Sequence, residues 1–318
     1  MQTFIFKRLI QGIIVLLLLS FLVFIVMRLL PGDPILLYYA QGDVTFLSPE
    51  QLETVRAEYG LDKPLVVQYF VWLFDIFKGD LGKSIFYREE VSTLLLERMP
   101  VTIHLGILAI LSGAIIGIAF GVVCALRRGT FIDSLLTFIA NIGITAPGFW
   151  VGILLIFLFA LQWQLLPTNG YTSPFTDFTL STRQLVMPVF CLSFFSLASM
   201  ARQTRSSMLE VVRQDYVRTA WAKGLQERAI VTRHIIKNGL IPVVTMFGMQ
   251  VRTIFGGSVL IETVFNVPGF GRLLVQSVLA QDFQIVQGGV LVIATIVVIS
   301  NLLVDISYGW LDPRIRYS

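Results

Sequence analysis

The sequence predicts an all-α membrane protein that crosses the bilayer six times. Hydrophobic residues make up 55% of the 318-residue chain and charged residues only 14%, whereas soluble domains carry about a quarter charged residues. The hydrophobic residues gather in long stretches nearly free of charge, each near or above the roughly 20 residues that a helix needs to cross a bilayer. These stretches are residues 9–27, 99–126, 134–176, 184–201, 239–261 and 283–304.

The first stretch follows Lys7 and Arg8, as the apolar part of a signal peptide would. It is longer than the usual apolar part, however, and no small-x-small cleavage site follows it. We therefore expect it to remain as the first membrane helix, within an N-terminal region of residues 1–30.

Residues 31–98 separate the first two spans and are predicted to form a small helical insert. Apolar side chains follow a helical spacing over residues 49–61. Residues 69–77 predict a second, strongly aromatic helix. Its aromatic face either packs on the membrane domain or lies in the interface, and the alternative is a docking surface for an external partner.

Residues 99–318 contain the other five spans and are predicted to form the core of the protein. The second span carries Gly113, Gly117 and Gly121 at intervals of four residues. Small residues on one face let helices approach closely within lipid, so we predict tight helix packing here. The third stretch is long enough for two crossings, but its second half is polar and rich in Gly and Pro; it is counted as one span.

The loop of residues 202–238 between the fourth and fifth spans is predicted to be a helix, a sharp turn and a second helix. Good helix formers run from Ser206 to Lys223 and end at Gly224, which can adopt the left-handed conformation that ends many helices. Aromatic and small residues surround this turn, so the loop has the shape of a knuckle that fits a partner's cleft. Four apolar residues are expected to share one face of the second helix: Leu225, Ala229, Ile236 and Leu240.

The basic residues predict that both termini and the 202–238 loop lie in the cytoplasm, because positively charged flanks resist translocation. In this orientation the cytoplasmic side carries 14 Lys and Arg against 6 acidic residues, and the opposite side carries 9 against 14. The net charge of +4 therefore reflects membrane topology and gives no reason to expect a nucleic-acid partner.

Nucleotide binding by the chain itself is not expected. Gly82-Lys83-Ser84 matches the end of a phosphate-binding loop, but Phe77 stands where that motif needs its first glycine. The segment also lies on the outer side in the predicted orientation, where there is no ATP. We interpret it as a turn.

Membrane-embedded catalysis and metal binding are not expected either. His104 and His234 have no other ligand-type residue at metal-binding spacing, and we expect His104 to be a satisfied interior histidine. Cys124 and Cys191 lie at different depths and are predicted to pack as buried apolar groups. No nucleophile with an adjacent base stands in the spans.

The 202–238 loop resembles the cytoplasmic coupling motif of the permease subunits of ABC importers, in the dipeptide and oligopeptide branch. The resemblance begins at Asp215 and runs through Arg218-Thr219-Ala220 to Gly224, followed by Pro242. Further motifs of the branch occur in order along the chain: Leu30-Pro31-Gly32-Asp33-Pro34, Gly79-Asp80-Leu81-Gly82, Pro147 with Phe149-Trp150, and residues 267–272 and 312–317.

The resemblance implies the type I ABC importer permease architecture and a non-catalytic subunit in the cytoplasmic (inner) membrane of a bacterium or archaeon. Such a subunit pairs with a homologous second permease and two ATPase subunits and receives substrate from an extracytoplasmic binding protein. It holds no cofactor, since the ATPase subunits bind ATP and Mg. The implied ATPase-coupling residues are Asp215, Tyr216, Arg218, Thr219, Ala220, Ala222, Lys223, Gly224 and Pro242.

Peptides are the cargo that the resemblance implies, while glutathione or a nickel complex remain open because relatives in the branch carry them. The six stretches contain no Asp or Glu, which argues against the less favoured alternative, an ion-coupled secondary transporter. Arg252 is the single charge within a predicted span. We predict that it lines the substrate pathway, since exposure to lipid is costly; a structural hydrogen bond to a carbonyl is the alternative.

Overall fold

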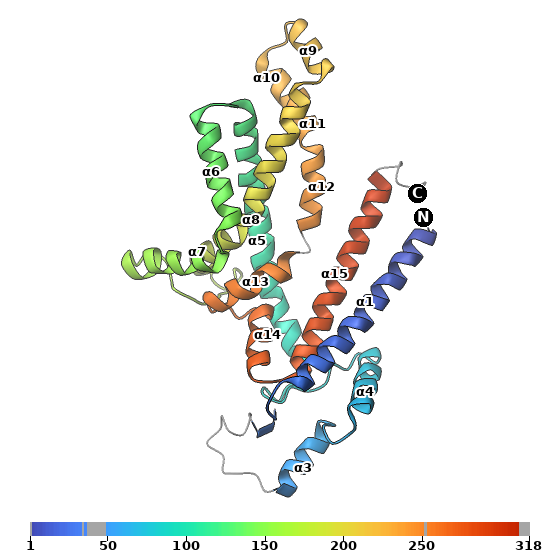
Figure 1. Cartoon of the computed structure of the whole chain (residues 1–318). Helices are drawn as coiled ribbons and strands as arrows, with labels where there is room; N and C mark the ends of the chain where they lie inside the picture. Colours follow the sequence, from blue (N-terminus) through green and yellow to red (C-terminus); the bar gives the residue numbers. More distant parts are fainter. Residues whose placement is uncertain (1, 34, 37–48, 251–252, 312–318) are drawn as a thin grey trace. The chain divides into compact units, whose positions relative to one another are not determined.

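The computed structural model describes residues 2–33, 35–36, 49–250 and 253–311, and the elements formed by these residues are helices (Figure 1). The chain divides into two compact units, which are described separately. One comprises residues 1–100 with 269–318, and the other residues 101–268.

In the first unit, α1 (Gln2–Leu29) packs along α15 (Phe283–Leu311). Their contact is close, because a Cβ added at Gly12 would lie 2.7 Å from Cγ1 of Val298. The beginning of α1 and the end of α15 lie at the same end of this pair (Figure 1). The unit also contains α3 (Pro49–Glu58), α4 (Leu65–Phe77), the start of α5 (Val91–Leu126) and α14 (Phe270–Leu279).

The predicted helical insert is confirmed by α3 and α4. The aromatic residues of α4 divide between two faces. The Tyr69 ring lies 5.4 Å from that of Phe24 in α1, and Trp72 is buried beside it. Phe70 and Phe74 are exposed on the opposite side. The helix therefore packs on the membrane helix by one face, and the expected docking role of the other face stays a prediction.

An ion pair anchors α3 to the segment after α1. Arg56 of α3 pairs with Asp33, whose carboxylate also accepts hydrogen bonds from the N–H groups of Ile35 and Leu36. Burial alone would raise the pKa of Asp33, but these hydrogen bonds and the charge of Arg56 together lower that pKa below its ordinary value. The Asp33 carboxylate is therefore held in its charged form.

The segment that imitates a phosphate-binding loop is a turn, as interpreted from the sequence. Gly79 and Gly82 both have φ in the left-handed region, at 87° and 82°. Ser84 is fully buried and its hydroxyl donates to Asp282 Oδ2 at 2.5 Å. The backbone N–H of Phe86 donates to the same oxygen at 3.0 Å. The serine thus fastens the insert to the start of α15.

The second unit contains the rest of α5 and most of the predicted core. Its helices after α5 are α6 (Phe131–Thr145), α7 (Gly148–Leu155), the π-helix η1 (Ile156–Gln162), α8 (Phe178–Val212), α9 (Asp215–Ala222), α10 (Glu227–Ile230), the π-helix η2 (Val231–Ile236), α11 (Lys237–Gly239), α12 (Ile241–Gln250) and α13 (Thr253–Val264).

Four of the six predicted spans correspond to single long apolar helices in the described residues, namely α1, α5, α8 and α15. The third predicted span is instead two helices, α6 and α7 with η1, bent by 105°. The bend falls at Ala146, which is extended (ψ 127°) because a residue before proline disfavours helical backbone. The fifth predicted span corresponds to α12 and α13, and Arg252 between them lies outside the described residues.

The glycine stripe of α5 packs directly on α8, which confirms the predicted close approach. A Cβ added at Gly113 would lie 2.7 Å from the carbonyl oxygen of Ser193, and one at Gly117 would lie 2.5 Å from that of Leu197. A Cβ at Gly121 would lie 2.4 Å from Cβ of Thr204. Such distances leave no room for any side chain.

We expect Gly117→Val to destabilise the second unit by about 1–3 kcal/mol, because the new side chain overpacks a backbone contact. The measurement is the thermal midpoint of the detergent-purified chain. Gly256→Val is the matched control, since Gly256 also lies in a helix but an added Cβ there meets no atom of the described residues within 4 Å. Equal midpoints for the two variants would contradict the packing argument.

Candidate functional site

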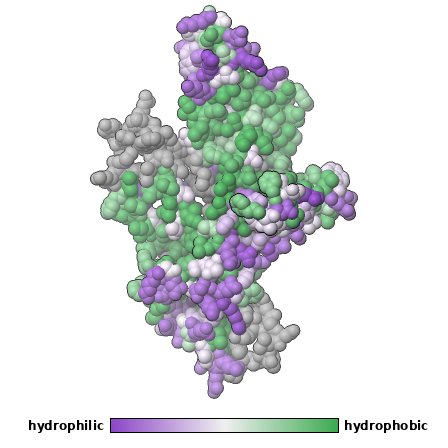
Figure 2. Space-filling view, turned by 180° about the vertical axis from the view of Figure 1, so that it is seen from behind, coloured by the Kyte–Doolittle hydropathy of each residue, from purple (hydrophilic) through white to green (hydrophobic). Residues whose placement is uncertain are grey.

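Residues 213–236 form a hairpin at one end of the second unit, beyond the long helix α8 (Figure 1). We call it the coupling hairpin. Hydrophilic side chains gather over this tip, whereas hydrophobic side chains cover the helices next to it (Figure 2). This division is expected of a hairpin that projects from a membrane-embedded bundle into water.

The coupling hairpin is held by its own small core. Val217 and Ala220 of α9 are buried against Ile230 and Ile235 of the second arm, and Met208 of α8 completes the cluster. Ala125 at the end of α5 belongs to the same cluster. The hairpin is thus continuous with α8 and α5 through packed side chains, and Ala220 faces this core, away from solvent.

The predicted single helix from Ser206 to Lys223 is wrong, because α8 ends at Val212 and α9 begins at Asp215. Gln214 between them is extended, with ψ 146°. The break lets α9 turn its one apolar face into the hairpin core. Asp215 stands in the first turn of α9, where a negative charge is favoured by the helix dipole.

Gly224 ends the first arm as predicted. Its φ of 72° lies in the left-handed region, and an added Cβ would meet nothing within 4 Å. The N–H of Gly224 donates to Trp221 O, and the N–H of Lys223 donates to Thr219 O. Backbone hydrogen bonds therefore close the turn. Glycine is favoured at position 224 because of its left-handed backbone conformation, and no described neighbouring atom would clash with a side chain there.

The predicted apolar face of the second arm is confirmed only in part. Ile236 and Leu240 are partly buried against neighbouring core clusters, but other residues of this arm are more deeply buried. Its buried residues are Ile230, Ile235 and Gly239, whereas Leu225 is 43% exposed. The cause is η2, whose π-helical turns place residues five apart on the same side. The residue spacing of an α-helix does not predict which residues share a face of a π-helix.

The exposed side of the hairpin carries most of the residues that the sequence identified. Tyr216 and Trp221 expose 43% and 50% of their surface, and the Tyr216 hydroxyl accepts a hydrogen bond from Asn238 Nδ2 at 3.2 Å. Asp215, Arg218, Thr219, Ala222 and Lys223 are also exposed. Pro242 is exposed but lies apart, in the first turn of α12. The hairpin therefore contains all of the identified residues except Pro242. Within the hairpin, Ala220 faces the core and the others are exposed.

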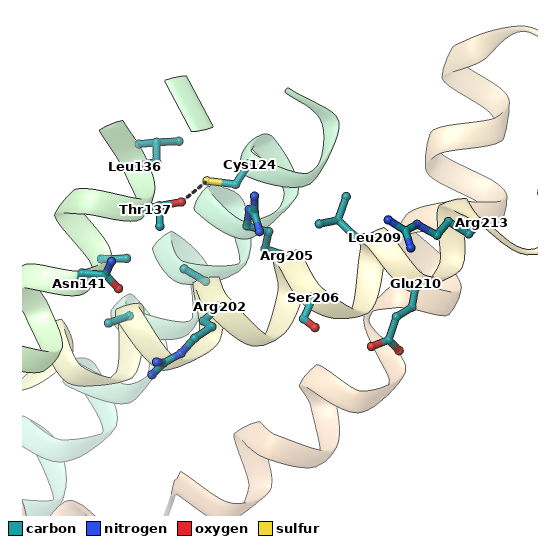
Figure 3. Close-up of a pocket in the computed structure, with 13 residues that line it drawn as sticks. Cys124, Leu136, Thr137, Asn141, Arg202, Arg205, Ser206, Leu209, Glu210 and Arg213 are labelled. Atoms are coloured by element: carbon teal, nitrogen blue, oxygen red, sulfur yellow. Dashed lines mark hydrogen bonds between the residues drawn. The ribbon is translucent and has the colours of Figure 1, made fainter. Parts of the chain in front are cut away.

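An ion pair that sequence reasoning missed fastens α6 to α8 below the hairpin. Arg205 donates to both carboxylate oxygens of Asp133 at 2.9 Å, and the N–H of Gly129 donates to Asp133 Oδ2 at 3.0 Å. Arg205 also lines a cavity of about 470 Å³ between α5, α6 and α8, into which Cys124 and Thr137 converge (Figure 3). Arg202 and Glu210 of α8 also line it (Figure 3).

A second, more apolar cavity of about 700 Å³ lies between α5, α7, α8, α12 and α13. It is lined by Phe149, Phe195 and Gln250 among others, and by Ser196, whose buried hydroxyl has no hydrogen-bond partner among the described residues. Such a cavity inside a membrane-spanning unit is suited to a passing solute.

The remaining candidates of the sequence analysis take structural roles. His104 Nδ1 lies 3.1 Å from the Tyr171 hydroxyl, which confirms a satisfied interior histidine. Cys124 and Cys191 are both buried free thiols. Among the described residues there is no cluster of His, Cys, Asp or Glu able to hold a metal ion.

One buried carboxylate belongs to a helix that corresponds to a predicted span, although no acidic residue was expected there. Glu262 belongs to α13 and is fully buried, and the Thr102 hydroxyl donates to its Oε1 at 2.6 Å. It stands one residue beyond the fifth apolar stretch, where counting charges within that stretch could not include it. The absence of acids from the spans is therefore a weaker argument than the sequence suggested.

Comparison with known proteins matches residues 117–317 to the family "Binding-protein-dependent transport system inner membrane component" and residues 1–106 to the N-terminal model of the same transport systems. A candidate peptide transport system permease protein of Brucella abortus (strain 2308) is 43% identical over 318 residues, with 100% of both chains covered. The dipeptide transport system permease protein of Escherichia coli (strain K12) is 37% identical, with 94% of both covered.

A solved structure of an amino acid ABC transporter with histidines shares the fold. Its TM-score is 0.50 at 18% identity, and the match covers 70% of this chain and 94% of that one.

Proposed function

The chain belongs to the family of binding-protein-dependent transport system inner membrane components, and from this premise we propose that it is the permease subunit that forms half of a peptide pathway in an ABC importer. The names of its relatives support peptides as the cargo. Glutathione and nickel complexes are the alternatives that the same architecture could carry.

The observation that carries the proposal is the coupling hairpin, which has an exposed outer side and a packed core of its own. A rounded surface with two half-exposed aromatic rings and several charges fits a cleft in a partner, because aromatic residues dominate the energy of such contacts. We propose that each of two ATPase subunits, which bind ATP and Mg, holds one such hairpin, one from this chain and one from a homologous second permease. An extracytoplasmic binding protein would deliver the substrate.

The packing of the hairpin explains how movement of an ATPase would reach the pathway. The hairpin core includes Met208 of α8, and α8 is tied to α6 by Arg205 and packed on the glycine stripe of α5. A displacement of α9 is therefore passed to α8, which also lines the 700 Å³ cavity. The ATPase subunits with and without ATP would contact the hairpin differently, and ATP binding would therefore favour one of two arrangements of α8 and the helices packed on it.

We propose the cytoplasmic membrane as the location, with both termini and the hairpin in the cytoplasm, as the charge distribution of the loops supports. The pairing of the α1 start with the α15 end is consistent with this orientation. Arg252, which lies outside the described residues, is still proposed to line the pathway; Gln250, two residues earlier in the chain, lines the 700 Å³ cavity.

The test is uptake of a labelled dipeptide by vesicles that contain the four-subunit complex. We expect uptake to require ATP at the hairpin side and the binding protein at the other side, and to survive collapse of proton and sodium gradients. The chain alone should neither hydrolyse ATP nor move the dipeptide. Uptake that collapses with an ion gradient, and that Glu262→Gln abolishes, would instead favour an ion-coupled transporter.

A further inference from the structure

The first unit contains a polar cavity of about 310 Å³ beside the helical insert. Its walls come from the end of α1, the turn after α3, α4, the turn at residues 80–83 and the beginning of α15. The coupling hairpin and both cavities of the second unit involve none of these residues. The cavity therefore shares no residue with the site on which the proposed function rests.

Four residues that line this cavity each carry a buried polar atom with no hydrogen-bond partner among the described residues. These atoms are Arg28 Nη1, Trp72 Nε1, Gln284 Oε1 and Gln287 Nε2. Trp72 is only 8% exposed and Gln287 only 2%. Buried polar groups are almost always paired in folded proteins, and an unpaired one is explained by a bound molecule, water or stored strain. Four such atoms around one cavity indicate a bound occupant.

The Arg28 guanidinium is held rigidly with one nitrogen free. Its Nε donates to Gln68 Oε1 at 3.0 Å, and its Cζ lies 4.3 Å from the Phe283 ring centroid and 5.0 Å from that of Phe24. Gln68 is fixed in turn, because its Nε2 donates to the carbonyls of Leu61 and Lys63. The free Nη1 is thus a pre-positioned cationic donor that faces the cavity.

The unpaired atoms define the chemistry of the occupant. Three of the four are donors, and one of these carries a positive charge. The charges at the exposed rim nearly cancel, since Glu58, Asp75 and Asp80 face Lys63 and Lys83 there. The buried donors of the wall therefore determine which molecule binds. A carboxylate complements them best, because it accepts several hydrogen bonds and pairs with a guanidinium.

We propose that this cavity is a binding site for the carboxylate of a small molecule. The site belongs to the insert of this chain and does not depend on which cargo the pathway carries. Its size admits a molecule of a few non-hydrogen atoms with associated water.

The indole N–H of Trp72 provides a direct probe. The full chain is labelled with ¹⁵N at its five tryptophan indoles and placed in lipid nanodiscs, and the Trp72 signal is assigned by its loss in Trp72→Phe. Sodium acetate or alanyl-alanine is then titrated against sodium chloride at constant ionic strength. We expect a saturable shift of the Trp72 signal alone, because a carboxylate accepts its N–H.

Two variants separate a binding site from a merely structural cluster. Arg28→Gln should weaken binding about tenfold or more, since a charge-assisted hydrogen bond is lost, while Arg183→Gln, which removes a charge that is not part of the cavity lining, should not. Gln287→Leu should weaken binding without lowering the thermal midpoint, because the Gln287 amide nitrogen has no hydrogen-bond partner in the described part of the chain.

No saturable shift with either probe, or equal affinity in Arg28→Gln and the unmodified chain, would overturn the proposal and leave water as the occupant. The measurement uses neither ATP nor the ATPase subunits, so its result is independent of the transport function.

Discussion

Gly224→Val is expected to abolish most ATP-driven uptake by the assembled importer while the chain still inserts and the ATPase subunits still hydrolyse ATP. The glycine has φ 72° and open space around an added Cβ, so valine causes backbone strain without a steric clash. That strain is roughly 1–2 kcal/mol for an L-residue, and relief of it requires a different turn. The exposed aromatic rings would then leave the positions that the ATPase cleft requires.

The measurement is the number of dipeptides imported per ATP hydrolysed, and we expect this ratio to fall about tenfold or more, as a strain of this size implies. Gly79→Val is the matched control, because Gly79 has φ 87° and an equally open surrounding among the described residues but lies in the turn after α4, outside the coupling hairpin. Equal ratios for the two variants would show that general backbone strain, and not the geometry of the coupling hairpin, determines coupling.

Much of the fold was predictable because a membrane helix is identified by a long run of apolar residues. An apolar stretch of about 20 residues has few structural choices in lipid, and four predicted spans are single helices. The third stretch shows where composition fails, because Pro147 breaks it at Ala146. The length and hydropathy of a stretch predict that it can cross the membrane, but they do not predict a 105° bend within it.

The exposed part of the candidate site was predictable for a different reason, since the turn at Gly224 is a local property of the chain. Its support was not predictable. Asp133 and Arg205 are 72 positions apart, and nothing in a single sequence pairs an acid with one of many basic residues. The inward orientation of Ala220 follows from the break at Gln214, which a run of good helix formers conceals.

The cavity beside the insert illustrates the same limit. Arg28, Trp72 and Gln287 are ordinary residues in sequence, and only the fold places their unpaired nitrogens around one space. Functional sites built from distant residues require the structure, whereas turns and spans require only their own segment.

Trp221→Ala is expected to release the ATPase subunits from the complex. Trp221 is half exposed at the last turn of α9, next to the turn at Gly224, and its neighbours in the hairpin core are buried. Truncation therefore removes a large contact surface and leaves the hairpin packing intact. A central tryptophan of an interface commonly contributes about 2 kcal/mol or more, which corresponds to roughly a 30-fold loss of affinity.

The loss is measured as the concentration of ATPase subunit that half-saturates permease-containing nanodiscs. Trp163→Ala is the matched control, because Trp163 is 56% exposed but lies after η1, outside the coupling hairpin. We expect its affinity to equal that of the unmodified chain. Should Trp221→Ala bind the ATPase as tightly as this control, the exposed aromatic surface would not be the contact, and the transfer of motion through Met208 to α8 would lose its starting point.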